Sequence, residues 1–191
     1  YTNVRVLNAA SFTGSTSLAG NLTVAGSGNL TIGGNEIAVG GTFATQSTSV
    51  LTMQNAAGVL AVTGDATFSG GSTNTRLTAG TLRVAGDFVQ SGSAAAFAAT
   101  LNHMTVLNGA TAQNVSFANP GTTTLLSHFQ RLEIDNASAG GVTLDSAGFA
   151  NGQLRTPAGP SVQRPLSSAG LTLQVGGLDA VRLVQDGTPH H

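Results

Sequence analysis

The chain has 191 residues, of which 40% are hydrophobic and only 8% are charged, and its formal net charge is −1 at pH 7. An ordinary soluble domain has roughly 25% charged residues. The near-neutral charge argues against a nucleic-acid-binding protein, because such a protein needs clustered cations to displace counterions from phosphate. Disordered chains combine low hydrophobicity with high net charge, and this chain has neither. We therefore expect a folded protein whose polar surface consists mainly of Thr, Ser, Asn and Gln.

The absence of cysteine excludes disulfides and thiolate metal sites. No run of 18 apolar residues occurs, so no membrane span is expected. The chain begins with Tyr1 rather than Met, which a removed signal peptide or a trimmed terminus would explain. His190 and His191 at the other end are assigned no function.

A short alternating segment that ends at Gly or Asn-Gly recurs along the first half of the chain. The last four copies of this segment end at Gly40, Gly64, Gly86 and Gly109, and these glycines are almost evenly spaced. Alternation of this kind is typical of β-strands, and the even spacing indicates a repeat. The segments are 22–26, 37–40, 60–64, 82–86 and 104–109.

A second element follows the glycine and contains an aromatic residue, as at Phe43, Phe68 and Phe88. Ser-, Thr- and Gly-rich residues come next, so each repeat consists of a strand, a glycine corner, a second strand and a polar turn. The corner glycines are expected to tolerate positive φ. Only residues 94–99, which are rich in Ala, have the composition of a short helix.

The glycine spacing corresponds to a period of about 22–24 residues, which is a repeat length typical of solenoids. It predicts an all-β fold of the parallel β-helix or β-solenoid type, in which one period makes one rung. A single rung cannot bury its apolar face, so rungs stack at about 4.8 Å and share a core. The alternative is an antiparallel β-sandwich, which also uses many short strands. The even phasing favours the solenoid.

The pattern loosens after Gly109, although strands are still expected at 113–117, 132–136 and 141–144. Three of the five prolines lie within 155–165, which predicts a loop or an extended connector. The segments 171–175 and 180–184 predict a closing hairpin. The resulting division is a β-solenoid repeat region at 1–145, a Gly/Pro-rich connector at 146–170, and a C-terminal hairpin with a polar tail at 171–191.

Residues 108–117 read N-G-A-T-A-Q-N-V-S-F, and residues 128–136 and 142–144 read H-F-Q-R-L-E-I-D-N and V-T-L. This text resembles a pattern in secreted bacterial repeat proteins of the parallel β-helix, adhesin-like type. Their pattern is N-G-x-x-x-Q-x-[VI]-x-F, then F-x-x-L-x-I-x-N, then V-x-L. The resemblance is good over the stretch 108–144 and looser upstream of it. It implies an exported surface protein built from parallel β-helical rungs, and it implies no particular activity.

The densest group of carboxylates is Glu133, Asp135 and Asp145. Glu133 and Asp135 are two positions apart, so on a strand they share one face, where a calcium site or an acid–base pair is conceivable. Charges usually mark a solvated face, so we expect them to decorate the face opposite Leu132 and Ile134.

Asp65 and Asp87 each follow a corner glycine, which predicts either a stacked ladder or, more simply, carboxylates that cap their turns. His103 and His128 are too isolated for a metal site, and Ser127 lacks a G-x-S-x-G elbow. No catalytic, cofactor-binding or metal-binding residue is therefore predicted, and the chain is expected not to be an enzyme.

The first functional hypothesis is an extracellular or cell-surface structural protein. In it, the solenoid is a subunit of a filament or adhesin-like scaffold that joins copies of itself end to end, because an open rung exposes unpaired backbone groups. The segments 4–7 and 171–184 are the candidate joining elements.

The alternative hypothesis is a carbohydrate-binding or carbohydrate-cleaving β-helix with surface glycans as partners. The absence of Trp and the single Tyr count against it. A third hypothesis is a segment of a longer exported protein without an activity of its own.

Overall fold

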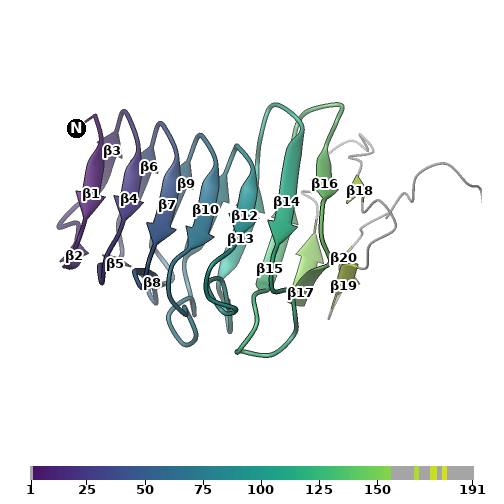
Figure 1. Cartoon of the computed structure of the whole chain (residues 1–191). Coiled ribbons are helices and arrows are strands. Elements are labelled where there is room, and N and C mark those ends of the chain that lie inside the picture. The colour runs from purple at the N-terminus through teal and green to yellow at the C-terminus, as the bar shows by residue number, and fades with distance from the viewer. Residues whose placement is uncertain (1, 156–165, 168–172, 176–177, 180–191) are drawn as a thin grey trace, which may run out of the picture.

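The structure, a computed structural model, describes residues 2–155, 166–167, 173–175 and 178–179. These residues form a β-solenoid of about seven turns, in which successive rungs stack side by side along one axis (Figure 1). Every pairing between described strands is parallel, which confirms the predicted β-solenoid and excludes the antiparallel sandwich. In this part of the chain, no helix is long and apolar enough to cross a membrane.

Three sheets run along the solenoid. The eight-stranded sheet contains, in order, β1 (Val4–Val6), β4 (Leu22–Val24), β7 (Phe43–Gln46), β10 (Ala66–Ser69), β12 (Phe88–Gln90), β14 (Gln113–Phe117), β16 (Val142–Leu144) and β18 (Leu166–Ser167). The nine-stranded sheet contains β3 (Thr16–Leu18), β6 (Glu36–Val39), β9 (Val59–Val62), β11 (Thr81–Val84), β13 (Met104–Leu107), β15 (Phe129–Ile134), β17 (Gly148–Arg155) and β19 (Leu173–Val175), with β20 (Leu178–Asp179) also paired to β17. The three-stranded sheet contains β2 (Ala9–Ser11), β5 (Asn29–Ile32) and β8 (Val50–Met53).

The sequence predicts a repeat with two strands, so it does not predict the three-stranded sheet. Beyond β8 it shrinks to isolated parallel bridges, from Met53 to Leu77 and from Leu77 to Ala99. Residues 94–99 form a turn followed by these bridges, so the short helix considered for this segment is not formed. The small alanine side chains of this segment allow close packing, because residues 95–99 are all buried.

The repeated segments do not all occupy one sheet. Residues 22–24 form β4 of the eight-stranded sheet, whereas the equivalent-looking segments at 37–39, 60–62 and 82–84 lie in the nine-stranded sheet. Strands of both sheets alternate apolar and polar residues and lead into a glycine corner, so they look the same in sequence. Their true equivalents follow from pairing: Leu22 is in register with Phe43.

Both long sheets continue past residue 145, because β17 and β19 extend the nine-stranded sheet and β18 extends the eight-stranded one. Most of the predicted connector at 146–170 and the second half of the predicted hairpin at 180–184 lie outside the described residues. The strand at 173–175, within the first half of that hairpin, pairs in parallel with β17.

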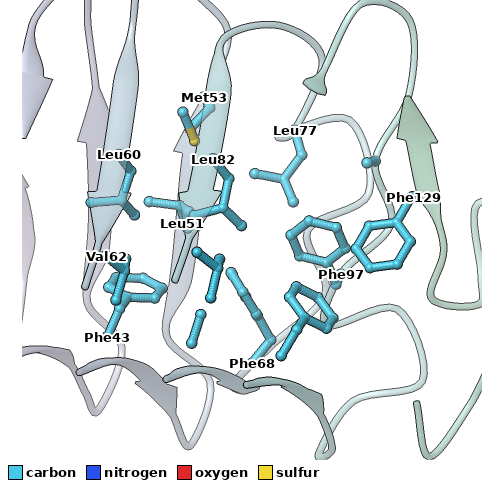
Figure 2. Close-up of a cluster of buried hydrophobic side chains, with 14 of the residues drawn as sticks. Phe43, Leu51, Met53, Leu60, Val62, Phe68, Leu77, Leu82, Phe97 and Phe129 are labelled. Atoms are coloured by element: carbon cyan, nitrogen blue, oxygen red, sulfur yellow. The ribbon is translucent and has the colours of Figure 1, made fainter. Parts of the chain in front are cut away.

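Phenylalanine side chains pack in the core together with leucine, valine and methionine side chains (Figure 2). In the eight-stranded sheet, Phe43 is in register with Ala66, and Thr45 with Phe68. These two rungs therefore each supply one large and one smaller inward residue, and the large residue changes place from one rung to the next. The rings pack together, with the Phe68 and Phe97 centroids 4.6 Å apart. Burying each such side chain contributes about 1.5–3 kcal/mol.

Two of the corner glycines, Gly64 and Gly86, are required by close packing of backbones rather than by positive φ. A Cβ atom on Gly64 would lie 2.8 Å from the Gly41 carbonyl oxygen, and one on Gly86 would lie 2.5 Å from the Gly64 carbonyl carbon. Neither Gly64 nor Gly86 has positive φ, whereas Gly26 does, at 63°. The prediction that glycine supplies φ > 0 at these corners is thus right for Gly26 and wrong for Gly64 and Gly86.

The residues that follow Gly64, Gly86 and the equivalent positions of other rungs form a ladder of side-chain hydrogen-bond acceptors. Asp65 Oδ1 accepts the Asp87 backbone N–H at 2.9 Å, and Asp87 Oδ1 accepts the Asn114 N–H at 2.7 Å. Asparagines do the same in the first rungs, where Asn3 caps Asn21 and Asn21 caps Thr42, each at 2.8 Å. The two aspartates therefore stack as a ladder, and each caps the corner of the following rung.

This ladder predicts that Asp65 stabilises the fold through its acceptor oxygen and not through its charge. We expect Asp65→Ala to lower the free energy of unfolding by about 1 kcal/mol, the usual contribution of one hydrogen bond. Asp65→Asn keeps the acceptor and removes a like charge next to Asp87, so its stability should equal or exceed that of the parent. Urea unfolding at pH 7 measures both variants, and equal destabilisation by Ala and Asn would contradict the prediction.

Candidate functional site

A groove lies on the outer face of the nine-stranded sheet, centred on β13. It encloses about 620 Å³. This volume falls within the usual range for small-molecule sites. Three of the seven arginines and two of the eight acidic residues line it, so within the groove the formal charge is +1. Its principal residues are Arg83, Met104, Val106, Arg131, Glu133 and Arg155.

Strand register brings these residues together from four successive rungs. Arg83 of β11 is aligned with Val106 of β13, which is aligned with Glu133 of β15 and then with Arg155 of β17. A parallel column of Met104, Arg131 and Gln153 lies beside it. The inward neighbours Leu82, Leu107 and Leu132 are buried in the core, so period-two alternation directs the charged residues outward.

The floor of the groove is apolar. Val106 is only 9% exposed, yet it does not belong to the hydrophobic core cluster. It lies instead on the outer face, where Arg83 and Glu133 are its register partners on the two adjacent strands. The short side chain of Val106 lies between the long side chains of Arg83 and Glu133, and this difference in length produces the depression. Met104 extends the floor of the depression.

The wall on the β15 and β17 side is held by pairing between side chains. Arg155 forms an ion pair with Glu133 and donates to the same carboxylate oxygen through Nε. The Glu133 side chain is only 13% exposed as a result. Arg131 donates through Nε and one terminal nitrogen to Gln153 Oε1, at 3.3 and 3.2 Å. Glu133 thus faces outward as expected, but its arginine partner covers it.

Arg83, on the opposite wall, is exposed and has no side-chain hydrogen bond or ion pair with any residue that the structure describes. The side-chain amides of Asn102 and Asn108, at the two ends of β13, are likewise unbonded within the described part of the chain. These three groups offer donors and acceptors to a molecule in the groove.

The sequence prediction grouped Glu133, Asp135 and Asp145, and the structure separates them. Glu133 and Asp135 both line the groove, whereas Asp145 follows β16 of the eight-stranded sheet, is exposed, and donates its N–H to the Val115 carbonyl at 2.9 Å. Among the described residues, no three His, Asp or Glu side chains lie close enough together to hold a metal ion.

Sequence reasoning missed the arginines of the groove because each belongs to a different rung, far from the others along the chain. Two of these arginines, Arg83 and Arg155, can be found in the sequence because they occupy the same middle position of the repeated segment in the nine-stranded sheet. That position holds Ala in the rungs of β6 and β9, then Arg83, Val106, Glu133 and Arg155. A switch from small to charged residues at one repeat position marks where the groove begins.

The remaining polar candidates are structural. Ser127 is buried, donates to the Ala94 carbonyl at 2.9 Å and accepts the Phe97 N–H at 3.1 Å, so its hydroxyl is occupied. The His128 ring contacts the Leu126 carbonyl through Nδ1 at 3.0 Å, and burial lowers its pKa. Neither side chain lines the groove.

The residues that carry the resemblance to secreted repeat proteins build a corner of the solenoid. Gln113 is buried and accepts the Gly109 N–H at 2.8 Å and an Asn136 amide hydrogen at 2.9 Å through its carbonyl oxygen. Its Nε2 donates to the carbonyls of Val84 and Gly86. Phe117 belongs to the core. The motif therefore specifies an architecture.

His103 is buried within the core beside Phe97, with ring centroids 5.9 Å apart. Its Nδ1 lies 2.9 Å from the Ala79 carbonyl oxygen, which fixes Nδ1 as the donor, and Nε2 has no partner among the described residues. Burial lowers the pKa of His103 to about 4, because the charged ring would lose its hydration.

The depressed pKa predicts a loss of stability in acid that depends on His103. The unfolded chain binds this proton below its ordinary pKa of 6.5 and the folded chain only below about 4, so stability falls as the pH is lowered through this window. This residue should account for about 3 kcal/mol of the fall, which is the pKa difference expressed as free energy.

Urea unfolding of the parent and of His103→Leu at pH 7 and pH 4 measures the effect. The variant should lose distinctly less stability between the two pH values, whatever its stability at pH 7. His128→Leu is the companion variant, because His128 also has a lowered pKa. An unchanged pH dependence in His103→Leu would show that His103 does not titrate in this window.

We compared the chain with protein-family models, with curated proteins and with solved structures, and none of the three comparisons found a match. The solenoid, its first rung and the charged groove are the features that bear on function.

Proposed function

We propose that this chain is a non-catalytic structural segment of an extracellular or cell-surface scaffold, such as a bacterial filament or adhesin. In this proposal, the first rung of its solenoid pairs with a rung of a second copy. Support for export comes from the low charge, the Thr- and Ser-rich composition and the resemblance of residues 108–144 to secreted repeat proteins. Support for end-to-end pairing comes from the first rung.

The strands of the first rung, β1, β2 and β3, are each the terminal strand of their sheet among the described residues. The core is accessible beside them, in a cavity of about 390 Å³ lined by Val4, Phe12 and three Ser and Thr residues. Val4 and Phe12 are partly buried and pack against the core cluster. A further rung placed here would cover them, as the second rung covers the first.

The backbone of β1 offers hydrogen bonds to such a rung. The Val4 N–H donates to Asn21 and the Val6 carbonyl accepts from Ala25, both at 2.8 Å, so these groups point toward β4. Because backbone directions alternate along a strand, the N–H and carbonyl of Arg5 point to the opposite side. An added parallel strand would bond to them.

Nothing in these three strands blocks an added strand. Natural edge strands are often protected by Lys, Pro, bulges or inward charges. In β1, β2 and β3 the only charged residue is Arg5, and none is proline. Since all rungs run in parallel, a second copy displaced along the solenoid axis would present strands in the correct direction, and such a head-to-tail contact repeats without closing.

The proposal predicts association that increases with concentration and that depends on the outward N–H of Arg5. Arg5→Pro removes this N–H and leaves the bonds of Val4 and Val6 to β4 in place, as proline permits on an edge strand. Arg5→Gln is the matched control, because it removes the charge and keeps the N–H. Light scattering over a concentration series, with electron microscopy of the concentrated samples, follows the assembly.

We expect the parent and Arg5→Gln to form end-to-end oligomers and Arg5→Pro to remain monomeric, with circular dichroism showing the same β content in all three. A parent chain that stays monomeric at millimolar concentration, or an Arg5→Pro variant that assembles like the parent, would refute the proposal.

A further inference from the structure

We infer that the groove along β13 binds an acidic saccharide, that is, a sugar chain that carries carboxylates beside hydroxyls, with Arg83 as the residue that binds a carboxylate. This inference concerns the side of the solenoid and is independent of how its ends assemble. Glu133, Arg155 and the Arg131–Gln153 pair would form one wall, and Arg83 the other.

Arg83 is the groove arginine whose side chain has no partner among the described residues. Glu133 neutralises Arg155, and Arg131 already donates twice to Gln153. With respect to the described residues, the guanidinium donors of Arg83 therefore remain for a ligand. A guanidinium presents a fork of N–H groups that matches a carboxylate in two parallel hydrogen bonds, which favours a carboxylate over a neutral ligand.

The rest of the groove favours a sugar as the bearer of that carboxylate. Val106 and Met104 give an apolar floor on which the C–H face of a sugar ring can lie. The unbonded amides of Asn102 and Asn108 stand at the two ends of this floor, and amides both donate to and accept from hydroxyls.

An acidic peptide fits the groove less well. Peptides that bind along a sheet usually add a strand to an open edge, but β13 is already paired on both sides, with β11 and β15. No backbone groups of β13 are therefore free to hold a peptide main chain.

The test uses trigalacturonate, a linear trisaccharide with one carboxylate per ring, titrated into the full chain at low salt. Its fully methyl-esterified form is the matched neutral ligand, and hexaglutamate is the acidic peptide. Backbone NMR shifts locate the binding, and calorimetry gives the affinity. The variants are Arg83→Gln, which removes the free guanidinium, and Val106→Phe, which fills the floor while keeping a residue that favours strands.

Arg5→Gln serves as the control, because Arg5 is an exposed arginine on a strand outside the groove. We expect trigalacturonate to shift residues 102–108 and to bind at least tenfold more tightly than its ester. Arg83→Gln should weaken binding at least tenfold, Val106→Phe should abolish it, and Arg5→Gln should leave it unchanged.

Three results would overturn the inference. The first is no binding of trigalacturonate by the parent. The second is binding that Arg83→Gln and Val106→Phe leave as tight as in Arg5→Gln, which would place the ligand elsewhere. The third is hexaglutamate binding as tightly as trigalacturonate, which would make the groove a general anion site or a peptide site.

Discussion

Parallel, in-register hydrogen bonding between rungs is the constraint on which the whole structure depends. It places each residue directly above its equivalent in the preceding rung, so a side chain must be compatible with its own column. Gly64 and Gly86 are glycine because their backbones lie too close for a Cβ atom. Asp65 and Asp87 follow them because a side-chain acceptor at that position bonds to the next rung. The same bonding leaves unsatisfied groups wherever a strand has only one neighbour.

Stacking of the rungs also assembles the groove. The solenoid therefore has two kinds of surface, namely its lateral faces and its first rung. At the groove, β13 is paired on both sides, so only side chains can recognise a ligand there, as Arg83, Asn102 and Asn108 would. The first rung has the opposite character in our proposal, because its backbone would make the contacts and, apart from Arg5, the side chains of β1 and β2 are small or apolar. The two proposed contacts, with a small molecule on the side and with another chain at the end, would therefore not compete.

The fold could be predicted from the sequence because the alternation is visible within each strand and the repeat is visible from one rung to the next. The groove could not, because its residues meet only through register. Placing Arg83 beside Val106 and Glu133 requires knowing that the rungs lengthen beyond β12, where the steps from Phe88 to Val115 and from Val115 to Leu144 exceed those before them. Such insertions hide the period. The three-stranded sheet escaped prediction because its bridges beyond β8 consist of single residues, such as Leu77, that carry no pattern.

The alternation of large and small core residues has a consequence for how chains of this kind diverge. In two successive rungs, Phe43 with Thr45 and Ala66 with Phe68 each combine one large and one smaller core residue, although the position of the large residue is exchanged. Selection can then act on the volume of the pair while either single position drifts between Phe and a small residue. Two such solenoids could keep the same interior and lose their residue-by-residue similarity, and relatedness would survive in the summed volume of each rung.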